Sequence, residues 1–304
     1  MANFEPNETD GRILASLAEF RALTSKQIAL LHERNLKATE RRLRTLSDNS
    51  LVEARALNLG QSGRPEHVWS LGPAGFEFLG MATGAEGDAQ PARRMPTDLA
   101  HTQHLLLTNW FWICLRRLVR DFHELTVGSG PSASSSSSGR SQAAERLLAE
   151  IFPRGPAQLL PDGVFSLTHR EAGKTLLFFL EVDRGTERLN SQSDGPSSIR
   201  SKVVRYQDCF RSAQYKRYER AWNCALNGFR VLFLTDSPSR LKALCQLVEA
   251  SPPSDFVWLT DLPSMRKQGL AARLWLKGGR LTAARHSILG SKAPLDPATP
   301  SSRT

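Results

Sequence analysis

The chain has 304 residues, 40% of them apolar and 23% charged, an ordinary composition for a globular protein large enough to contain two domains. The 40 Lys and Arg against 30 Asp and Glu give a net charge of +10, which favours a polyanionic partner such as nucleic acid over a merely basic surface. No membrane-spanning apolar stretch, signal peptide or paired Cys spacing is present, so we expect a cytoplasmic protein without disulfides.

Residues 1–81 predict three short helices followed by a hairpin. The first helix is expected to begin at a capping Asp10, and its apolar positions follow helical spacing as far as Phe20. Thr24 or Ser25 is expected to cap the second helix, and residues 37–47 form the third.

Two extended runs follow, over residues 51–57 and 67–71, and the turn between them contains Gly60 and Gly63. Pro73 then stands where a further short helix would start. Helix, helix, helix and a two-stranded hairpin is the order of a winged helix-turn-helix domain, in which the third helix enters the major groove of double-stranded DNA.

The third helix carries side chains of the types that contact bases and phosphates. The expected DNA-binding residues are Lys37, Thr39, Arg41, Arg42 and Arg44, with Arg64 at the tip of the wing. The alternative is a solvated basic face, which is common on surface helices. The helix order and the net charge favour DNA binding.

Composition divides the rest of the chain. Residues 82–96 are typical of a linker, and residues 128–142, with their run of serines, of a disordered loop. The tail over 287–304 is also expected to be disordered.

Residues 97–286 predict a second domain. A long helix over 97–124 precedes a region where strands alternate with helices. The expected strands are 159–167, 175–182, 229–234 and 256–260, and the expected helices are 198–220 and 239–250. This alternation indicates a mixed α/β fold.

Three carboxylates suggest chemistry in this second domain. Asp162 follows Pro161 in the first strand region, and Glu181 and Asp183 end the second strand. Residues two apart on a strand point to the same face, and Asp162 joins them if the strands are neighbours. Such an oxygen cluster suits Mg²⁺ or Mn²⁺, which activates water for phosphodiester hydrolysis.

This pattern resembles that of the PD-(D/E)xK nuclease superfamily, which has a restriction-endonuclease-like fold. The resemblance implies that Asp162, Glu181 and Asp183 bind metal. The lysine that the superfamily carries two residues after the strand carboxylate is replaced here by Asp183. The resemblance implies that Lys202, on the following helix, supplies the amine of the missing lysine, and that Tyr206 lies one turn further on the same side of that helix. It also implies that Glu145 or Glu150 is the acidic residue of the preceding helix.

The layout as a whole resembles the replication-relaxation proteins of plasmids and other mobile elements. The string with the strongest resemblance is FFLEVDRGTE, residues 178–187. The resemblance implies a role in plasmid replication, DNA relaxation or mobile-element regulation, and winged-helix proteins often bind two half-sites as homodimers.

Three alternatives stay open for the second domain. Arg184 and Lys202 would neutralise the carboxylates in a purely structural ion-pair network. A degenerate nuclease fold would serve as a binding or dimerisation platform. A tyrosine relaxase is disfavoured, because no histidine cluster accompanies the three tyrosines at positions 206, 215 and 218.

Overall fold

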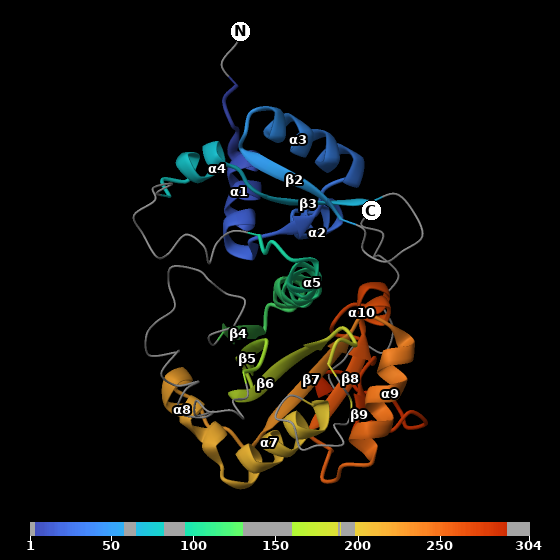
Figure 1. Ribbon diagram of the computed structural model, residues 1–304. Helices are drawn as coiled ribbons and strands as arrows, with labels where there is room; N and C mark the ends of the chain where they lie inside the picture. Colours follow the sequence, from blue (N-terminus) through green and yellow to red (C-terminus); the bar gives the residue numbers. More distant parts are fainter. Residues whose placement is uncertain are drawn as a thin grey trace, which may run out of the picture. The chain divides into compact units, whose positions relative to one another are not determined.

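The computed structural model describes residues 4–57, 65–81, 95–129, 160–187, 189 and 198–290 (Figure 1). The chain divides into two compact units, the first extending to Ile113 and the second starting at Cys114. This division falls inside helix α5 (Leu99–Asp121), whereas composition places the boundary at the linker over 82–96. The expected mixed α/β class is confirmed.

The first unit packs helices around a small antiparallel sheet. Its elements in chain order are α1 (Glu8–Phe20), β1 (Leu23–Thr24), α2 (Ser25–Leu31), α3 (Leu36–Asp48), β2 (Val52–Leu57), β3 (Glu66–Leu71) and α4 (Pro73–Phe78). The strands lie in the order β1-β3-β2, and both pairings are antiparallel. One apolar core joins the helices to the sheet; it includes Ile13, Leu14, Leu17, Ile28, Leu43, Leu46 and Trp69.

Of the two helix caps predicted from the sequence in this unit, one is confirmed and one is wrong. Thr24 caps α2 as expected, and its hydroxyl accepts from the backbone N–H of Gln27. The prediction that Asp10 caps α1 is wrong, because Asn7 holds that position and accepts from the Asp10 N–H at 3.0 Å. Asp10 instead accepts from the Asn7 N–H, which completes a capping box.

Buried amides fasten the N-terminal part of α5 to the rest of the first unit. The Asn109 side chain donates to the carbonyls of Phe20 and Ala22, at 3.0 and 2.8 Å. The Gln27 amide donates to the carbonyl of Leu106 at 2.7 Å. These bonds give the buried side-chain amides of Asn109 and Gln27 the acceptors that buried polar groups need. Across the described residues, no helix is long and apolar enough to cross a membrane.

The second unit is built on a six-stranded mixed sheet in the order β4-β5-β6-β7-β8-β9. Its strands are β4 (Leu125–Ser129), β5 (Gly163–His169), β6 (Lys174–Asp183), β7 (Phe229–Thr235), β8 (Val257–Asp261) and β9 (Leu276–Lys277). β4, β5 and β6 pair antiparallel, β6, β7 and β8 pair parallel, and β9 runs antiparallel to β8.

Helices α7 (Ile199–Arg211) and α9 (Pro238–Glu249) follow β6 and β7, whereas α8 (Arg217–Trp222) and α10 (Leu262–Gln268) are shorter (Figure 1). Leu177 and Phe179 of β6 belong to the same core cluster as Val203 of α7 and Leu244 of α9. Because side chains alternate along a strand, Glu181 and Asp183 point toward this helical side as well.

The single helix predicted over 198–220 is wrong. α7 stops at Arg211, Ala213 adopts a left-handed backbone with φ 53°, and a 3-10 turn (Gln214–Lys216) leads into α8. The break brings Tyr215 back beside Phe210, and both rings pack against Phe229. Burial of Tyr215 against Phe229 therefore outweighs helical continuity.

Two of the boundaries expected from composition are also wrong. Gly128 and Ser129 belong to β4, where they pair with Ser166 and Phe165. Ile288 is buried, and the Ser287 hydroxyl donates to the carbonyl of Ala271. Residues 130–142 and 291–304 lie outside the described part of the chain, as does most of the predicted linker.

Candidate functional sites

The outer face of α3 is a stripe of positive charge. Lys37, Arg41 and Arg44 are all exposed, and their spacing of four and three residues places them on one side of the helix. Leu43 and Leu46 occupy the opposite side and are fully buried. α3 therefore has one apolar face in the core and one face in solvent that carries these three cations.

Two of the residues predicted to bind DNA lie elsewhere on α3. Thr39 is fully buried, and its hydroxyl donates to the carbonyl of Asn35 at 2.9 Å. Arg42 turns back to α1, where its Nε donates to Asp10 Oδ1 at 2.6 Å and its Nη2 contacts Asp10 Oδ2. Its guanidinium also lies 5.1 Å from the centre of the Phe4 ring. These contacts give Thr39 and Arg42 structural roles in the fold.

The ion pair with Arg42 changes the acidity of Asp10. Burial acts to raise the pKa of Asp10, but the hydrogen bond from Arg42 and the Asn7 N–H outweigh it, so the pKa lies below its ordinary value. Asp10 is fully buried, so Arg42 supplies the charge that allows it to remain ionised.

A tight turn of four residues joins α2 to α3. It runs from His32 to Asn35, and Glu33 within it has a left-handed backbone with φ 52°. Asn35 then caps α3 by accepting from the N–H groups of Lys37 and Ala38. Arg64, predicted at the wing tip, lies outside the described residues.

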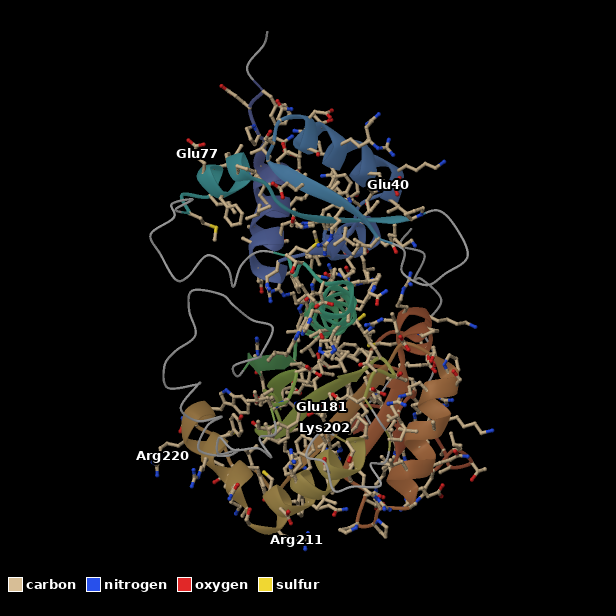
Figure 2. The ribbon with its side chains drawn as sticks, viewed as in Figure 1. Glu40, Glu77, Glu181, Lys202, Arg211 and Arg220 are labelled. Carbon is tan, nitrogen blue, oxygen red and sulfur yellow. The ribbon has the colours of Figure 1, made fainter. Side chains whose placement is uncertain are left out.

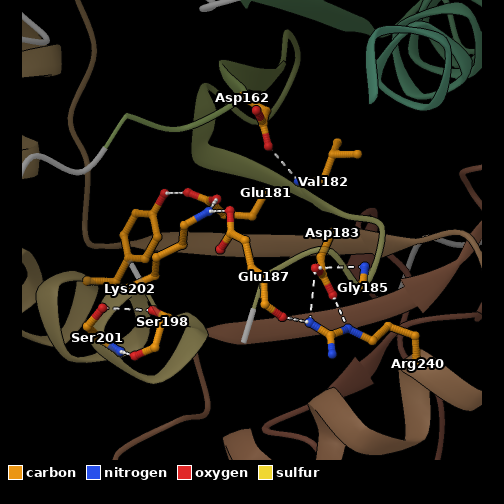
Figure 3. Close-up of polar contacts among 11 residues, drawn as sticks. Asp162, Glu181, Val182, Asp183, Gly185, Glu187, Ser198, Ser201, Lys202 and Arg240 are labelled. Carbon is orange, nitrogen blue, oxygen red and sulfur yellow. Dashed lines mark hydrogen bonds and ion pairs between the residues drawn. The ribbon is translucent and has the colours of Figure 1, made fainter. Parts of the chain in front are cut away.

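The predicted carboxylate cluster forms in part in the second unit. β5 and β6 are neighbours, and the pairing of Gly163 with Leu180 places Asp162 across from Glu181. Asp162 Oδ2 accepts from the Val182 N–H at 2.7 Å. The two residues that the sequence places 19 positions apart therefore meet at the same end of the sheet (Figure 3).

Glu181 is almost completely buried and is held by α7. Its Oε1 accepts from the Tyr206 hydroxyl at 2.6 Å, and its Oε2 accepts from Lys202 Nζ at 3.1 Å. Lys202 also donates to Glu187 Oε1 at 2.8 Å. Burial raises the pKa of Glu181 to about 7, with Lys202 opposing that rise and Asp162 adding to it.

Asp183 does not join this group, although it points to the same side of the sheet. Arg240 of α9 donates to both of its oxygens, from Nε at 2.6 Å and from Nη2 at 3.2 Å. The same guanidinium donates to the carbonyl of Glu187 at 2.7 Å, and the Gly185 N–H donates to Asp183 Oδ1 at 3.1 Å. Asp183 and Arg240 thus fix the turn that follows β6 (Figure 3).

Sequence spacing identifies Lys202 and Tyr206 as neighbours of Glu181, but it misses Arg240. Arg240 lies 57 residues beyond Asp183, in the first turn of a helix that only the sheet order brings close. Glu145 and Glu150, expected to add an acidic residue, lie outside the described part of the chain.

The donors at this site fit a divalent metal only in part. Carboxylate oxygens of Asp162 and Glu181 are the ligands that Mg²⁺ prefers. Both oxygens of Asp183 are bonded to Arg240, however, and those of Glu181 are bonded to Tyr206 and Lys202. Within the described residues, no group of three or more His, Cys, Asp or Glu is arranged to hold a metal ion. The three-carboxylate site expected from the sequence is therefore not formed by Asp162, Glu181 and Asp183.

The sequence matches the replication-relaxation family over residues 14–222, more than two thirds of the chain. The chain belongs to the replication-relaxation family. The matched region runs from α1 to α8, so it contains both the cationic face of α3 and the Asp162, Glu181 and Lys202 group.

Arg240 lies beyond the residues matched to the replication-relaxation family. A comparison with curated proteins and with solved structures found no match. The family therefore links this chain to replication and DNA relaxation. The chain's own role in these processes has to be inferred from the side chains of α3 and of the group around Glu181.

Proposed function

We propose that this replication-relaxation protein binds double-stranded DNA of a plasmid or other mobile element, and that it acts in replication, DNA relaxation or transcriptional control. The main evidence for this proposal is the cationic face of α3. Lys37, Arg41 and Arg44 project from a helix whose opposite side is anchored in the core, so their charges are held on a rigid support.

The order of elements supports a winged helix-turn-helix. α2, a four-residue turn and α3 are followed directly by the antiparallel pair β2 and β3. In domains of this type the second helix of the motif enters the major groove and the hairpin touches the flanking backbone. α3 is then the recognition helix, and arginine is the commonest reader of guanine there.

DNA binding by α3 is tested by titrating the full-length chain onto duplex DNA from its own element at several salt concentrations. We expect the logarithm of the binding constant to fall linearly with the logarithm of the salt concentration. A Lys37→Ala, Arg41→Ala, Arg44→Ala variant should lower that slope by about 0.9 for each phosphate that α3 no longer neutralises. Absence of salt-dependent binding by the wild type would contradict the proposal.

A second candidate function is metal-dependent cleavage of DNA, as in PD-(D/E)xK nucleases. Its support is that Asp162, just before β5, lies across from Glu181 of β6, and that the amine of Lys202 is bonded to Glu181. Asp162 and Glu181 would hold Mg²⁺ or Mn²⁺, which supplies an activated water and stabilises charge on the phosphate. Lys202 would hold the Glu181 carboxylate in position, and Tyr206 would add a hydroxyl hydrogen bond.

Cleavage is tested by relaxation of supercoiled plasmid with Mg²⁺ or Mn²⁺ present. Wild type is compared with Asp162→Ala and Glu181→Ala, and an Arg170→Ala variant at an exposed turn is the control. The nuclease proposal expects loss of relaxation in the two carboxylate variants alone. Equal relaxation by all four proteins would assign the activity to a contaminant or to another site.

A further inference from the structure

The surface formed by α7, the 3-10 turn and α8 is strongly basic. Residues 199–222 contain seven Lys and Arg against two Asp and Glu, a net charge of +5 within 24 residues. A charge of this density requires a partner or a counterion atmosphere.

Most of this charge lies at the surface. Lys202 and Arg205 are only partly exposed, and Lys202 points inward to Glu181. Arg200, Lys216 and Arg220 are exposed, as is Arg211, which pairs with Asp208 at 2.8 Å. Figure 2 shows Arg211 and Arg220 pointing outward, on the side of α7 and α8 away from the sheet.

The exposed side of α7 also has the right length and chemistry for a nucleic-acid backbone. Arg200, Val204 and Arg211 follow helical spacing along one side of the helix. The 13 residues of α7 extend about 20 Å, and duplex DNA carries about one phosphate per 1.7 Å of its axis, so several phosphates lie within reach.

The aromatic residue at this surface favours duplex over single-stranded DNA. Single-strand binding proteins combine basic grooves with aromatic rings on which bases stack. Phe210 is 41% exposed, but its ring already stacks on Tyr215 and Phe256, with 5.8 Å between centroids in each pair. Phosphate contact by the cations is therefore the interaction that this surface offers.

We infer that the outer surface of α7 and α8, carrying Arg200, Lys216 and Arg220, is a second contact for the phosphate backbone of double-stranded DNA, additional to α3. The inference rests on the proposed DNA-binding function. It gives the second unit a role in holding DNA that is independent of whether the carboxylate group cleaves it.

The test is a salt titration of duplex binding by the full-length chain. The variant Arg200→Ala, Lys216→Ala, Arg220→Ala is compared with the wild type and with a matched control, Arg170→Ala, Lys174→Ala, Lys242→Ala, which removes three exposed charges from other elements. We expect the salt slope of the α7–α8 variant to fall by about 2.7, and its affinity at 0.1 M salt to fall by between about two and three orders of magnitude. The control should keep most of the wild-type slope, and thermal unfolding should be similar for all three.

An unchanged slope in the α7–α8 variant, with the wild type binding normally, would overturn this inference and leave the proposed function standing. So would an equal fall in the matched control, which would indicate a general charge effect. A deficit confined to single-stranded probes would also overturn it. Absence of salt-dependent binding by the wild type would overturn both proposals.

Discussion

Two arginines one residue apart on α3 have different environments and different roles. Arg41 is exposed, whereas Arg42 is bonded to the buried Asp10 of α1. Sequence alone places both in the DNA-binding set, because the partner of Arg42 lies 32 residues earlier. The packing of α1 against α3 buries the partner of Arg42 and leaves Arg41 exposed, so Arg42 has a structural role and only Arg41 belongs to the proposed DNA contact.

Arg42→Ala should therefore destabilise the fold, and Arg41→Ala should not. Loss of Arg42 leaves Asp10 buried without its cation, at a cost of about 2 kcal/mol, less than for a fully buried pair because Arg42 is partly exposed. The pKa of Asp10 is lowered in the folded state, so this stability is present above the ordinary carboxylate range and is lost as pH falls through the lowered pKa. Urea unfolding of both variants at pH 7 and pH 3 measures this, and equal stability of the two at pH 7 would contradict it.

The Glu181 carboxylate provides a second prediction at the level of single residues. Lys202 holds the pKa of Glu181 down, whereas burial and Asp162 raise it to about 7. The substitution Lys202→Met should therefore raise the pKa of Glu181 further. The measurement is the NMR chemical shift of the Glu181 carboxyl carbon as a function of pH. A fall, or no change, would show that Lys202 does not act on Glu181 electrostatically.

This same raised pKa has a consequence for stability. A carboxyl group whose pKa is raised on folding binds its proton more tightly in the folded state, so its contribution declines as pH rises from the ordinary Glu range to about 7. The difference in unfolding free energy between wild type and Glu181→Gln should follow that decline. A difference independent of pH would be inconsistent with the raised pKa.

Arg240 and Asp183 should behave as a coupled pair. Asp183→Asn, Arg240→Met and the double variant form a cycle in which we expect a coupling free energy of about 1 to 3 kcal/mol. Additive losses would mean that the paired geometry contributes no stability. The prediction distinguishes this pair from a metal ligand set, since the measurement is made with chelator present.

At the scale of elements, the sequence predicts local structure well and long-range packing poorly. The sequence places α3 and β6 almost to their ends, because the apolar positions of α3 follow helical spacing and β6 is an apolar run bounded by charged residues. It misses the break at Ala213, which is determined by the packing of Phe210 and Tyr215 on Phe229. It also misses Arg240, which no local spacing connects to Asp183.

The docking of α4 against the start of β2 depends on a helical glycine. A Cβ on Gly75 would lie 2.1 Å from the carbonyl oxygen of Leu51, so Gly75→Ala requires the backbone to move and should cost more than about 2 kcal/mol. Gly11 in α1 is the matched control, because its Cβ would meet only Phe78 at 3.8 Å. Gly11→Ala should leave stability unchanged or raise it by up to about 1 kcal/mol, as helix propensity favours Ala. Equal thermal unfolding of both variants would contradict the close approach.

At the scale of the whole molecule, the two units carry cationic surfaces with different chemistry. α3 offers Lys37, Arg41 and Arg44 on a helix suited to a groove, and the surface of α7 and α8 offers cations suited to a backbone. Groove contacts specify sequence, whereas phosphate contacts add affinity at any sequence. The proposals therefore assign recognition to the first unit and additional affinity to the second.

The most direct test of the central claim is a footprint of the full-length chain on duplex DNA from its own element. We predict a protected segment with the wild type, its disappearance with the Lys37→Ala, Arg41→Ala, Arg44→Ala variant, and its retention with the Arg170→Ala, Lys174→Ala, Lys242→Ala control at the same concentration. A footprint of unchanged position and strength with the α3 variant would contradict the assignment of α3 as the recognition helix.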